Sequence, residues 1–127
     1  MREIKFHIYD KENKKYYSDV NFLSFCIGGI RFHWVDKDTQ MVTELKDGSY
    51  ELLQFTGLKD KNGREIFEGN IVHIGDMDRQ VVFIDAKFQL TGIDKIDNAF
   101  YDLQPSEELV IIGNIYENPE LLKEVVK

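Results

Sequence analysis

Three histidines are the residues of this sequence best suited to acid–base or metal chemistry. They are His7, His33 and His73, and each lies within a strand-like alternation of apolar and polar residues, far from the other two. A zinc site draws on three or four His, Cys or carboxylate ligands, often at short spacings along the chain. No metal-ligand pair such as His-x-His is present. We therefore expect histidines on surface or edge strands, and nothing in the sequence indicates that the fold brings them together.

Aspartates form two short pairs that look like fragments of calcium-binding loops. Asp36 and Asp38 make one pair, and Asp76 and Asp78 make the other. An EF-hand loop also needs further oxygen ligands, a central glycine and a terminal glutamate at fixed offsets. These are missing here, so turn capping and solubility explain both pairs better.

Three further acids, Asp60, Glu65 and Glu68, flank predicted hairpins in the middle of the chain. A carboxylate pair supports catalysis only when the two environments impose different protonation states. A linear sequence does not show those environments, and charged hairpin faces are common. The sequence thus assigns no catalytic residue, no metal ligand and no cofactor-binding residue, and we predict that the protein is not an enzyme.

Glycines and the single cysteine have structural explanations. A phosphate-binding loop needs clustered glycines that lead into a helix, whereas the glycines here recur every six residues between predicted strands, where turn geometry accounts for them. Cys26 excludes an intrachain disulfide and follows an apolar run, so we expect a buried, reduced thiol. The evenly spaced glycines are Gly57, Gly63, Gly69 and Gly75.

Aromatic residues support one binding hypothesis. Small β-barrels can stack the bases of single-stranded nucleic acid on exposed rings that alternate with Lys and Arg. The net charge of −7 works against phosphate binding, and core packing or a subunit interface is the better use of these rings. The candidate rings are Tyr16, Tyr17, Phe32 and Trp34, with Lys14, Lys15 and Arg31 nearby.

The elements that must position these residues are mostly short strands. A chain of 127 residues, 43% of them hydrophobic, suits one domain that fills its core without disulfides or metals. Asp47–Gly48 predicts a hairpin that leads into the next strand, and Asn62–Gly63 predicts a type I′ turn. Alternation and turn signals predict strands near residues 4–8, 15–17, 20–27, 30–35, 41–43, 50–55, 64–67, 71–74, 80–84, 88–90, 100–103 and 108–112.

The C-terminus has a different pattern. Asn118, Pro119 and Glu120 predict a helix start, with Asn as the N-cap and Pro at the first helical position. An apolar stripe at helical spacing follows, so we predict a short helix over residues 117–127 that packs on the sheet. The stripe consists of Leu121, Leu122, Val125 and Val126.

Three segments together resemble the YopX-like family of phage and prophage proteins. They are Met1–Asp10, the run from Leu53 to Val72 with Thr56-Gly57-Leu58-Lys59-Asp60 and Phe67-Glu68-Gly69-Asn70, and Ile112–Leu122. The resemblance therefore covers the whole chain. It implies a phage or prophage origin and an SH3-like barrel core, and it carries over no catalytic residue and no ligand.

Two departures from the family pattern are modest. His7, Ile8 and Tyr9 stand where the family opening usually has Arg and Trp, and Asn70 stands where Asp is common. An acid at position 70 could hold a metal or act as a base, and Asn would replace it poorly. In a turn, Asn serves equally well, and we take the turn interpretation.

The sequence therefore predicts a mostly β protein with three regions: an N-terminal β region (1–50), an SH3-like barrel core (51–116) and a C-terminal helix (117–127). We expect a phage or prophage accessory protein that binds an unidentified phage or host protein and that could form a homo-oligomer. Nucleic-acid association, by direct binding or by acidic mimicry of DNA, is the alternative. The N-terminus lacks the apolar core of a signal peptide, and no segment approaches the ~20 apolar residues of a membrane span. We expect a location in the bacterial cytoplasm, with no membrane partner.

Overall fold

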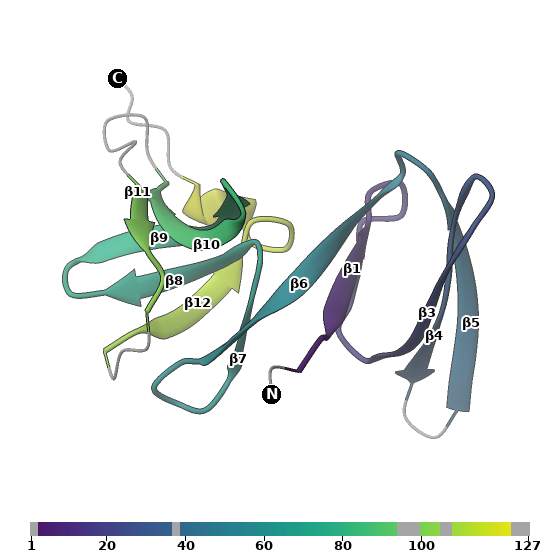
Figure 1. The fold of residues 1–127 in the computed structure, drawn as a ribbon, viewed down its shortest axis with the longest axis horizontal. Coiled ribbons are helices and arrows are strands. Elements are labelled where there is room, and N and C mark those ends of the chain that lie inside the picture. The colour runs from purple at the N-terminus through teal and green to yellow at the C-terminus, as the bar shows by residue number, and fades with distance from the viewer. Residues whose placement is uncertain (1–2, 37–38, 94–99, 105–107, 123–127) are drawn as a thin grey trace. The chain divides into compact units, whose positions relative to one another are not determined.

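The protein is mostly β in the computed structural model, which describes residues 3–36, 39–93, 100–104 and 108–122. This part of the chain forms twelve strands and one 3₁₀ turn at Pro119–Leu121, and Figure 1 shows how they are connected within each part of the chain. The chain divides into two compact units, residues 4–54 and residues 55–127 with the first three residues, and each is described by itself. The strands are β1 (Phe6–Asp10), β2 (Lys15–Tyr17), β3 (Val20–Cys26), β4 (Gly29–Asp36), β5 (Thr39–Lys46), β6 (Tyr50–Lys59), β7 (Glu65–Phe67), β8 (Asn70–Ile74), β9 (Met77–Ile84), β10 (Lys87–Gly92), β11 (Phe100–Asp102) and β12 (Val110–Asn114).

The 4–54 unit packs a three-stranded sheet, in the order β3-β4-β5, over β2, β1 and the first half of β6. Successive strand residues point to opposite faces, so Ile30 and Phe32 of β4 point into the core while Arg31 points out. Ile30 and Phe32 are fully buried, and Ile8 of β1 meets them from the other layer. The predicted alternation at residues 30–35 is thus confirmed as a half-buried strand. The strand predicted at residues 4–8 is found at Phe6–Asp10, and Ile4 lies outside it and is 70% exposed.

The Asp47–Gly48 turn joins β5 to β6, but these two strands do not form the predicted hairpin. The Ser49 amide donates to the Lys46 carbonyl at 3.0 Å and closes the turn. β5 pairs with β4, however, and β6 pairs with β1. The dipeptide correctly predicted a reversal of the chain, and the pairing was wrong because the turn connects two layers.

The 55–127 unit is built on a five-stranded antiparallel sheet in the order β11-β10-β9-β8-β12. Figure 1 shows this sheet strongly curled, most visibly at β9 and β10. Its concave side encloses a core of Ile66, Val72, Val81, Leu90 and Leu109. The second half of β6 pairs with β7, and the register shifts between Phe55 and Lys59.

The hairpin turns of this unit do not all have the predicted types. At Asn62–Gly63 only Gly63 has a positive φ, of 83°, so the turn is not type I′. The Gly63 amide instead donates to the Asp60 carbonyl at 3.0 Å. Positive φ at both central residues, which a type I′ turn requires, occurs at Asp85 (55°) and Ala86 (64°) between β9 and β10.

The predicted C-terminal helix is wrong for the residues that the structure describes. Pro119 does open a helical turn, but it is a 3₁₀ turn that ends at Leu121. The Asn118 side chain caps nothing there, because its Oδ1 accepts the Asn114 amide at 3.1 Å. Val125 and Val126, the second half of the predicted stripe, lie outside the described residues.

Candidate functional site

Asp60 is a buried charged group that accepts several backbone hydrogen bonds. Its side chain is 0% exposed, although it begins the loop between β6 and β7. Oδ1 accepts the amides of Asn62 and Arg64, each at 2.9 Å, and Oδ2 accepts the Ile111 amide at 3.0 Å. The Arg64 Nε lies 3.6 Å from Oδ2. Four donors therefore surround one carboxylate, as they do around a structural cap.

The ionisation of Asp60 reflects this cage. Burial opposes the charged form, but the amides of Ile111, Arg64 and Asn62 and the charge of Arg64 outweigh it, and the pKa of the carboxyl is held below its ordinary value. A general acid or base working near neutral pH needs the opposite shift. Asp60 is therefore an ionised acceptor with a structural role.

The Asp60 loop covers the outer edge of β12. The Lys61 amide donates to the Leu109 carbonyl at 2.9 Å, and an Arg64 Nη2 donor reaches the Ile111 carbonyl. Together with the Asp60–Ile111 bond, these contacts occupy backbone groups that an edge strand normally presents to solvent. Sequence reasoning missed this role, because an Asp before Asn-Gly has the signature of an exposed turn.

Other buried polar side chains of the segments that resemble the family also accept backbone amides. Asp10 accepts the amides of Glu12 and Asn13 at 3.1 and 3.2 Å and so closes the β1–β2 turn. Asn70 accepts the Phe67 amide at 2.7 Å, which confirms the turn interpretation of this position. Asn114 Oδ1 accepts the amides of Tyr116 and Glu117 at 2.9 and 2.8 Å.

The three histidines have separate neighbours. His7 Nδ1 lies 2.8 Å from the Tyr16 hydroxyl, and the His33 ring lies 5.4 Å from the Phe22 ring. His73 Nδ1 lies 2.6 Å from Asp78 Oδ1, across the β8–β9 hairpin. A carboxylate can orient an imidazole for proton transfer, but both groups of this pair are partly exposed on a hairpin face.

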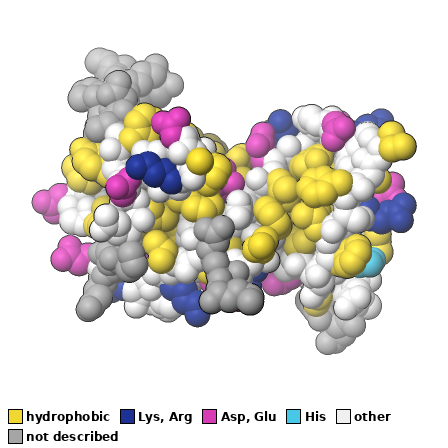
Figure 2. Space-filling model, in the orientation of Figure 1, with side chains coloured by type: hydrophobic (Ala, Val, Ile, Leu, Met, Phe, Trp, Pro, Cys, Tyr) yellow, Lys and Arg dark blue, Asp and Glu magenta, His cyan; other side chains and the backbone are white. Residues whose placement is uncertain are grey.

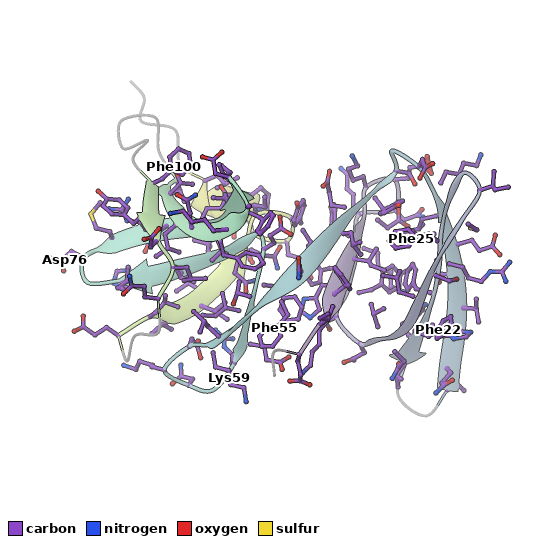
Figure 3. The ribbon with its side chains drawn as sticks, viewed as in Figure 1. Phe22, Phe25, Phe55, Lys59, Asp76 and Phe100 are labelled. Carbon is purple, nitrogen blue, oxygen red and sulfur yellow. The ribbon has the colours of Figure 1, made fainter. Side chains whose placement is uncertain are left out.

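The remaining acids do not assemble into a ligand cluster. Asp76 lies at the tip of the β8–β9 hairpin, as Figure 3 shows, whereas Asp78 pairs with His73. Asp36 ends β4, and Asp38 lies outside the described residues. Glu65 begins β7 and Glu68 follows it, and both are half-buried. Among the residues that the structure places, no group of three His, Cys, Asp or Glu side chains could hold a metal ion.

The structure shows which of Cys26 and the candidate aromatic residues are buried and which are exposed. The Cys26 thiol is exposed at the end of β3, so the expected burial is wrong. Its apolar neighbours misled the sequence reasoning, because Phe25 and Ile27 are exposed too. Phe32 and Tyr17 are buried in the core, as predicted, whereas Tyr16 and Trp34 are half-buried.

The glycines lie where backbone geometry requires them. Gly63, Gly69 and Gly75 have positive φ at turns, as predicted. Gly57 also has a positive φ, of 91°, but it lies inside β6, where the register with β7 shifts. It marks a β-bulge instead of a turn.

A groove of about 310 Å³ opens in the 55–127 unit between β6 and the β10–β11 edge. Leu58, Phe88 and Leu103 supply its apolar surface, and Thr56 and Gln104 supply polar groups. Lys87 and Asp102 also line it and pair at 2.9 Å, each more than half exposed. The groove marks the place where the curled sheet stops short of β6.

Exposed aromatic rings lie near this groove. Phe83 of the neighbouring strand β9 packs against the groove residue Phe88 at 4.8 Å between centroids and is itself about half exposed. Phe100 and Tyr101 of β11 are about half exposed, and the Arg79 guanidinium lies 4.2 Å from the Tyr101 ring centroid. Figure 3 labels Phe100 at the start of β11. Exposed aromatic rings and the backbone of the short strand β11 therefore lie close to the groove.

A second, smaller hollow of about 140 Å³ lies in the 4–54 unit beside Trp34. The Lys15 ammonium stands 4.5 Å from the Trp34 ring centroid, and Trp34 Nε1 donates to Thr43 at 2.8 Å. Tyr17 also lines the hollow, and burial raises the pKa of its hydroxyl. The cation already occupies the ring face that a nucleobase would stack on.

Among the described residues, no helix is long and apolar enough to cross a membrane.

Comparisons with known proteins agree on one family. A family model described as YopX protein matches residues 5–123. Two solved structures are similar over 97% of this chain and 100% of their own: protein EF1440 from Enterococcus faecalis, with 25% identity and a TM-score of 0.66, and protein yopX from Bacillus subtilis, with 21% identity and a TM-score of 0.61. No curated protein matches.

Proposed function

We propose that this chain, which belongs to the YopX family, is a non-enzymatic module that binds another protein. The observation that carries the proposal is the groove between β6 and the β10–β11 edge, with its apolar surface and bordering aromatic rings. Aromatic side chains are enriched at protein interfaces because each ring buries a large area at a small cost in conformational entropy.

The groove suits an extended segment of a partner. β11 is a three-residue edge strand, and its last residue, Asp102, lines the groove. An added strand would hydrogen-bond to that edge and place alternate side chains over Leu58, Phe88 and Leu103. The Lys87–Asp102 pair offers both charges at the same place, so a polar partner residue finds a complement there.

The buried polar residues support a role without catalysis. Asp10, Asp60, Asn70 and Asn114 all accept backbone amides that would otherwise be unpaired. Catalytic groups, in contrast, need side-chain atoms that reach a substrate. We therefore interpret these four residues of the family-like segments as caps of turns. Differences between family members in their surface residues would then determine which partner each one binds.

The proposal extends to origin and fold type. A phage or prophage accessory protein that acts in the bacterial cytoplasm on a phage or host protein fits the resemblance in the sequence. The curled five-stranded sheet of the 55–127 unit is consistent with an SH3-like barrel core.

Affinity capture from phage-infected or induced cells, followed by mass spectrometry, tests the function. Gln104 is exposed on the lining of the groove, so Gln104→Trp would fill it with little effect on the core. Lys61→Trp, on an exposed loop residue of the same unit, is the matched control. We expect a partner protein that the wild type and Lys61→Trp retain and Gln104→Trp loses. Nucleic acid alone in the eluate, or equal capture by all three proteins, would contradict the proposal.

A further inference from the structure

The sheet edges of this molecule are protected unequally. β2, β7 and β11 are only three residues long, and the Asp60 loop covers β12. β3 carries an irregularity between Val20 and Phe22 and lies near β1. Short strands, bulges and covering loops are the usual protections against edge-to-edge pairing.

β5 has none of these protections in the described part of the chain. It is eight residues long, contains no proline, and pairs with β4 from Thr39 to Lys46 without a register shift. It forms one edge of the three-stranded sheet. Met41 and Val42 are exposed on it, at 44% and 56%. A long and regular edge strand that exposes apolar side chains can act as a template for another strand.

The register shows which backbone groups of β5 face outward. The Asp47 amide donates to the Gly28 carbonyl at 2.8 Å, which makes Gly28 and Asp47 a hydrogen-bonded pair just beyond the strand ends. Hydrogen-bonded and non-bonded pairs alternate along an antiparallel ladder. Leu45, Thr43 and Met41 therefore bond to β4. The amides and carbonyls that face away from β4 belong to Gln40, Val42, Glu44 and Lys46.

The side chains of these outward-bonding residues lie on the outer face of the sheet. There, register places Phe22, His33 and Val42 side by side across β3, β4 and β5. Phe22 and Val42 are each 56% exposed, with His33 between them. We call this row the apolar stripe, and it ends at the open edge of β5. Figure 3 labels Phe22 and Phe25 at opposite ends of β3, and the stripe starts at Phe22.

We propose that β5 pairs antiparallel with β5 of a second copy of this chain, with Val42 opposite Val42, to form a continuous six-stranded sheet. This register forms hydrogen bonds at Gln40, Val42 and Glu44 of both copies, six in all, by the geometry of an antiparallel ladder. It places Gln40 opposite Glu44, an amide donor opposite a carboxylate. The apolar stripe then continues from Phe22 of one copy to Phe22 of the other.

Charge disfavours the registers centred on Glu44 and on Thr43. A two-fold axis at Glu44 would set two carboxylates directly opposite, which is destabilising. An axis at Thr43 would oppose Val42 to Glu44 and bring the two Glu44 side chains onto a diagonal. With the axis at Val42, the two Glu44 residues lie on opposite sides of the axis, and each keeps its own Arg31 at 2.6 Å.

The dimer uses a different surface from the groove that carries the proposed function, so either can hold without the other. A seven-residue strand pair buries less than the ~800 Å² per partner of a standard interface, so we expect a monomer at about 1 µM and a dimer at several hundred µM. Sedimentation velocity over that range measures the association. A wild type that stays monomeric at the highest concentration overturns the proposal.

Two variants test whether the edge drives the association. Val42→Pro removes an amide that faces outward, and proline is tolerated at such edge positions. Val42→Lys keeps the amide and adds a charge to the edge. It therefore tests dimer formation even if the proline variant unfolds. We expect both to remain monomeric, and circular dichroism checks that they are folded. Phe22→Lys, three strands from the axis in the new sheet, is the control and should still dimerise. Loss of the dimer in Phe22→Lys, together with its survival in Val42→Lys, would overturn edge pairing.

Disulfide trapping tests the register. In a Cys26→Ser background, which removes the exposed native thiol, Val42→Cys places two cysteines opposite each other at about 5.5 Å between Cα atoms. Glu44→Cys places them several residues apart. We expect a disulfide dimer for Val42→Cys and monomer for Glu44→Cys under mild oxidation. The reverse pattern would contradict the register.

Discussion

β12 of the 55–127 unit and β5 of the 4–54 unit are both edge strands, but their outward-facing backbone groups differ in what they contact. In the 55–127 unit the Asp60 loop bonds to Leu109 and Ile111 and covers the edge of β12. In the 4–54 unit β5 presents outward-facing backbone groups at Gln40, Val42 and Glu44. The side chains of the two units also differ. On the face that Figure 2 shows, the apolar side chains of the 4–54 unit gather in one area, whereas charged and polar groups interrupt them on the 55–127 unit. The outward-facing backbone groups of β12 bond to Asp60 and its loop, whereas those of β5 are the groups that we propose pair with a second copy.

Removal of the carboxylate that covers β12 should have the largest effect. Asp60→Ala leaves the amides of Asn62, Arg64 and Ile111 without their acceptor. Because unsatisfied buried donors and charge-assisted hydrogen bonds are expensive to lose, we expect a loss of about 3 kcal/mol in the free energy of unfolding. Urea denaturation measures this value. Asp76→Asn, at an exposed hairpin tip, is the control and should change it by less than ~0.5 kcal/mol.

Acid should remove the contribution of Asp60 gradually. Its folded pKa lies below the ordinary value, so the contribution is fully present above the unfolded pKa of ~3.9 and is lost as pH falls through the folded value. The difference in unfolding free energy between wild type and Asp60→Asn should therefore shrink from about pH 5 to about pH 2. A difference that stays constant over this range would show that the charge of Asp60 contributes nothing.

Backbone strain is a feature that the two units share, and its relief should have a moderate effect. Ala86 in the 55–127 unit has a φ of 64°, and Lys14 in the 4–54 unit has a φ of 53°. Glycine adopts these angles without a steric cost, so Ala86→Gly and Lys14→Gly should each stabilise the protein by about 0.5–1 kcal/mol. Thermal unfolding checks both. Gly75→Ala, at a φ of 62° with open space around the new Cβ, should cost a similar amount.

Exposed ion pairs should matter least in either unit. Arg31–Glu44 in the 4–54 unit and Lys87–Asp102 in the 55–127 unit both have side chains more than half exposed. Such pairs contribute little because water and salt screen them. We expect Glu44→Gln and Asp102→Asn to change the unfolding free energy by less than ~0.5 kcal/mol at low protein concentration. A larger change for one of them would reveal a difference between the units that geometry does not show.

Local patterns predicted most strands, because alternation reports which side of a strand is buried. The strands at 15–17, 71–74 and 100–103 appear within a residue of their predicted positions. Partners were harder to predict. Asp47–Gly48 reverses the chain, yet the strands on either side enter different layers. Choice of partner depends on which layer buries Ile8, Ile30 and Phe32, and that is a property of the whole unit.

The candidate site was largely hidden from the sequence for a related reason. Asp60 was identified as a charged residue of interest, but its burial follows from Leu109 and Ile111, about 50 residues further along the chain. No local pattern carries that contact. The prediction of a C-terminal helix was wrong for a similar reason. The Asn118 side chain accepts the Asn114 amide and therefore does not take the role of helix cap that its position in the sequence predicts.

Trp34 makes the two units separable by spectroscopy. It is the only tryptophan of the chain, it is half-buried in the 4–54 unit, and the indole is held by Thr43 and by Lys15. Its fluorescence therefore reports the unfolding of that unit alone, whereas far-ultraviolet circular dichroism reports the strands of both. Coincident transitions by the two probes would mean that the units unfold as one cooperative body, and separate transitions would mean that each has its own stability.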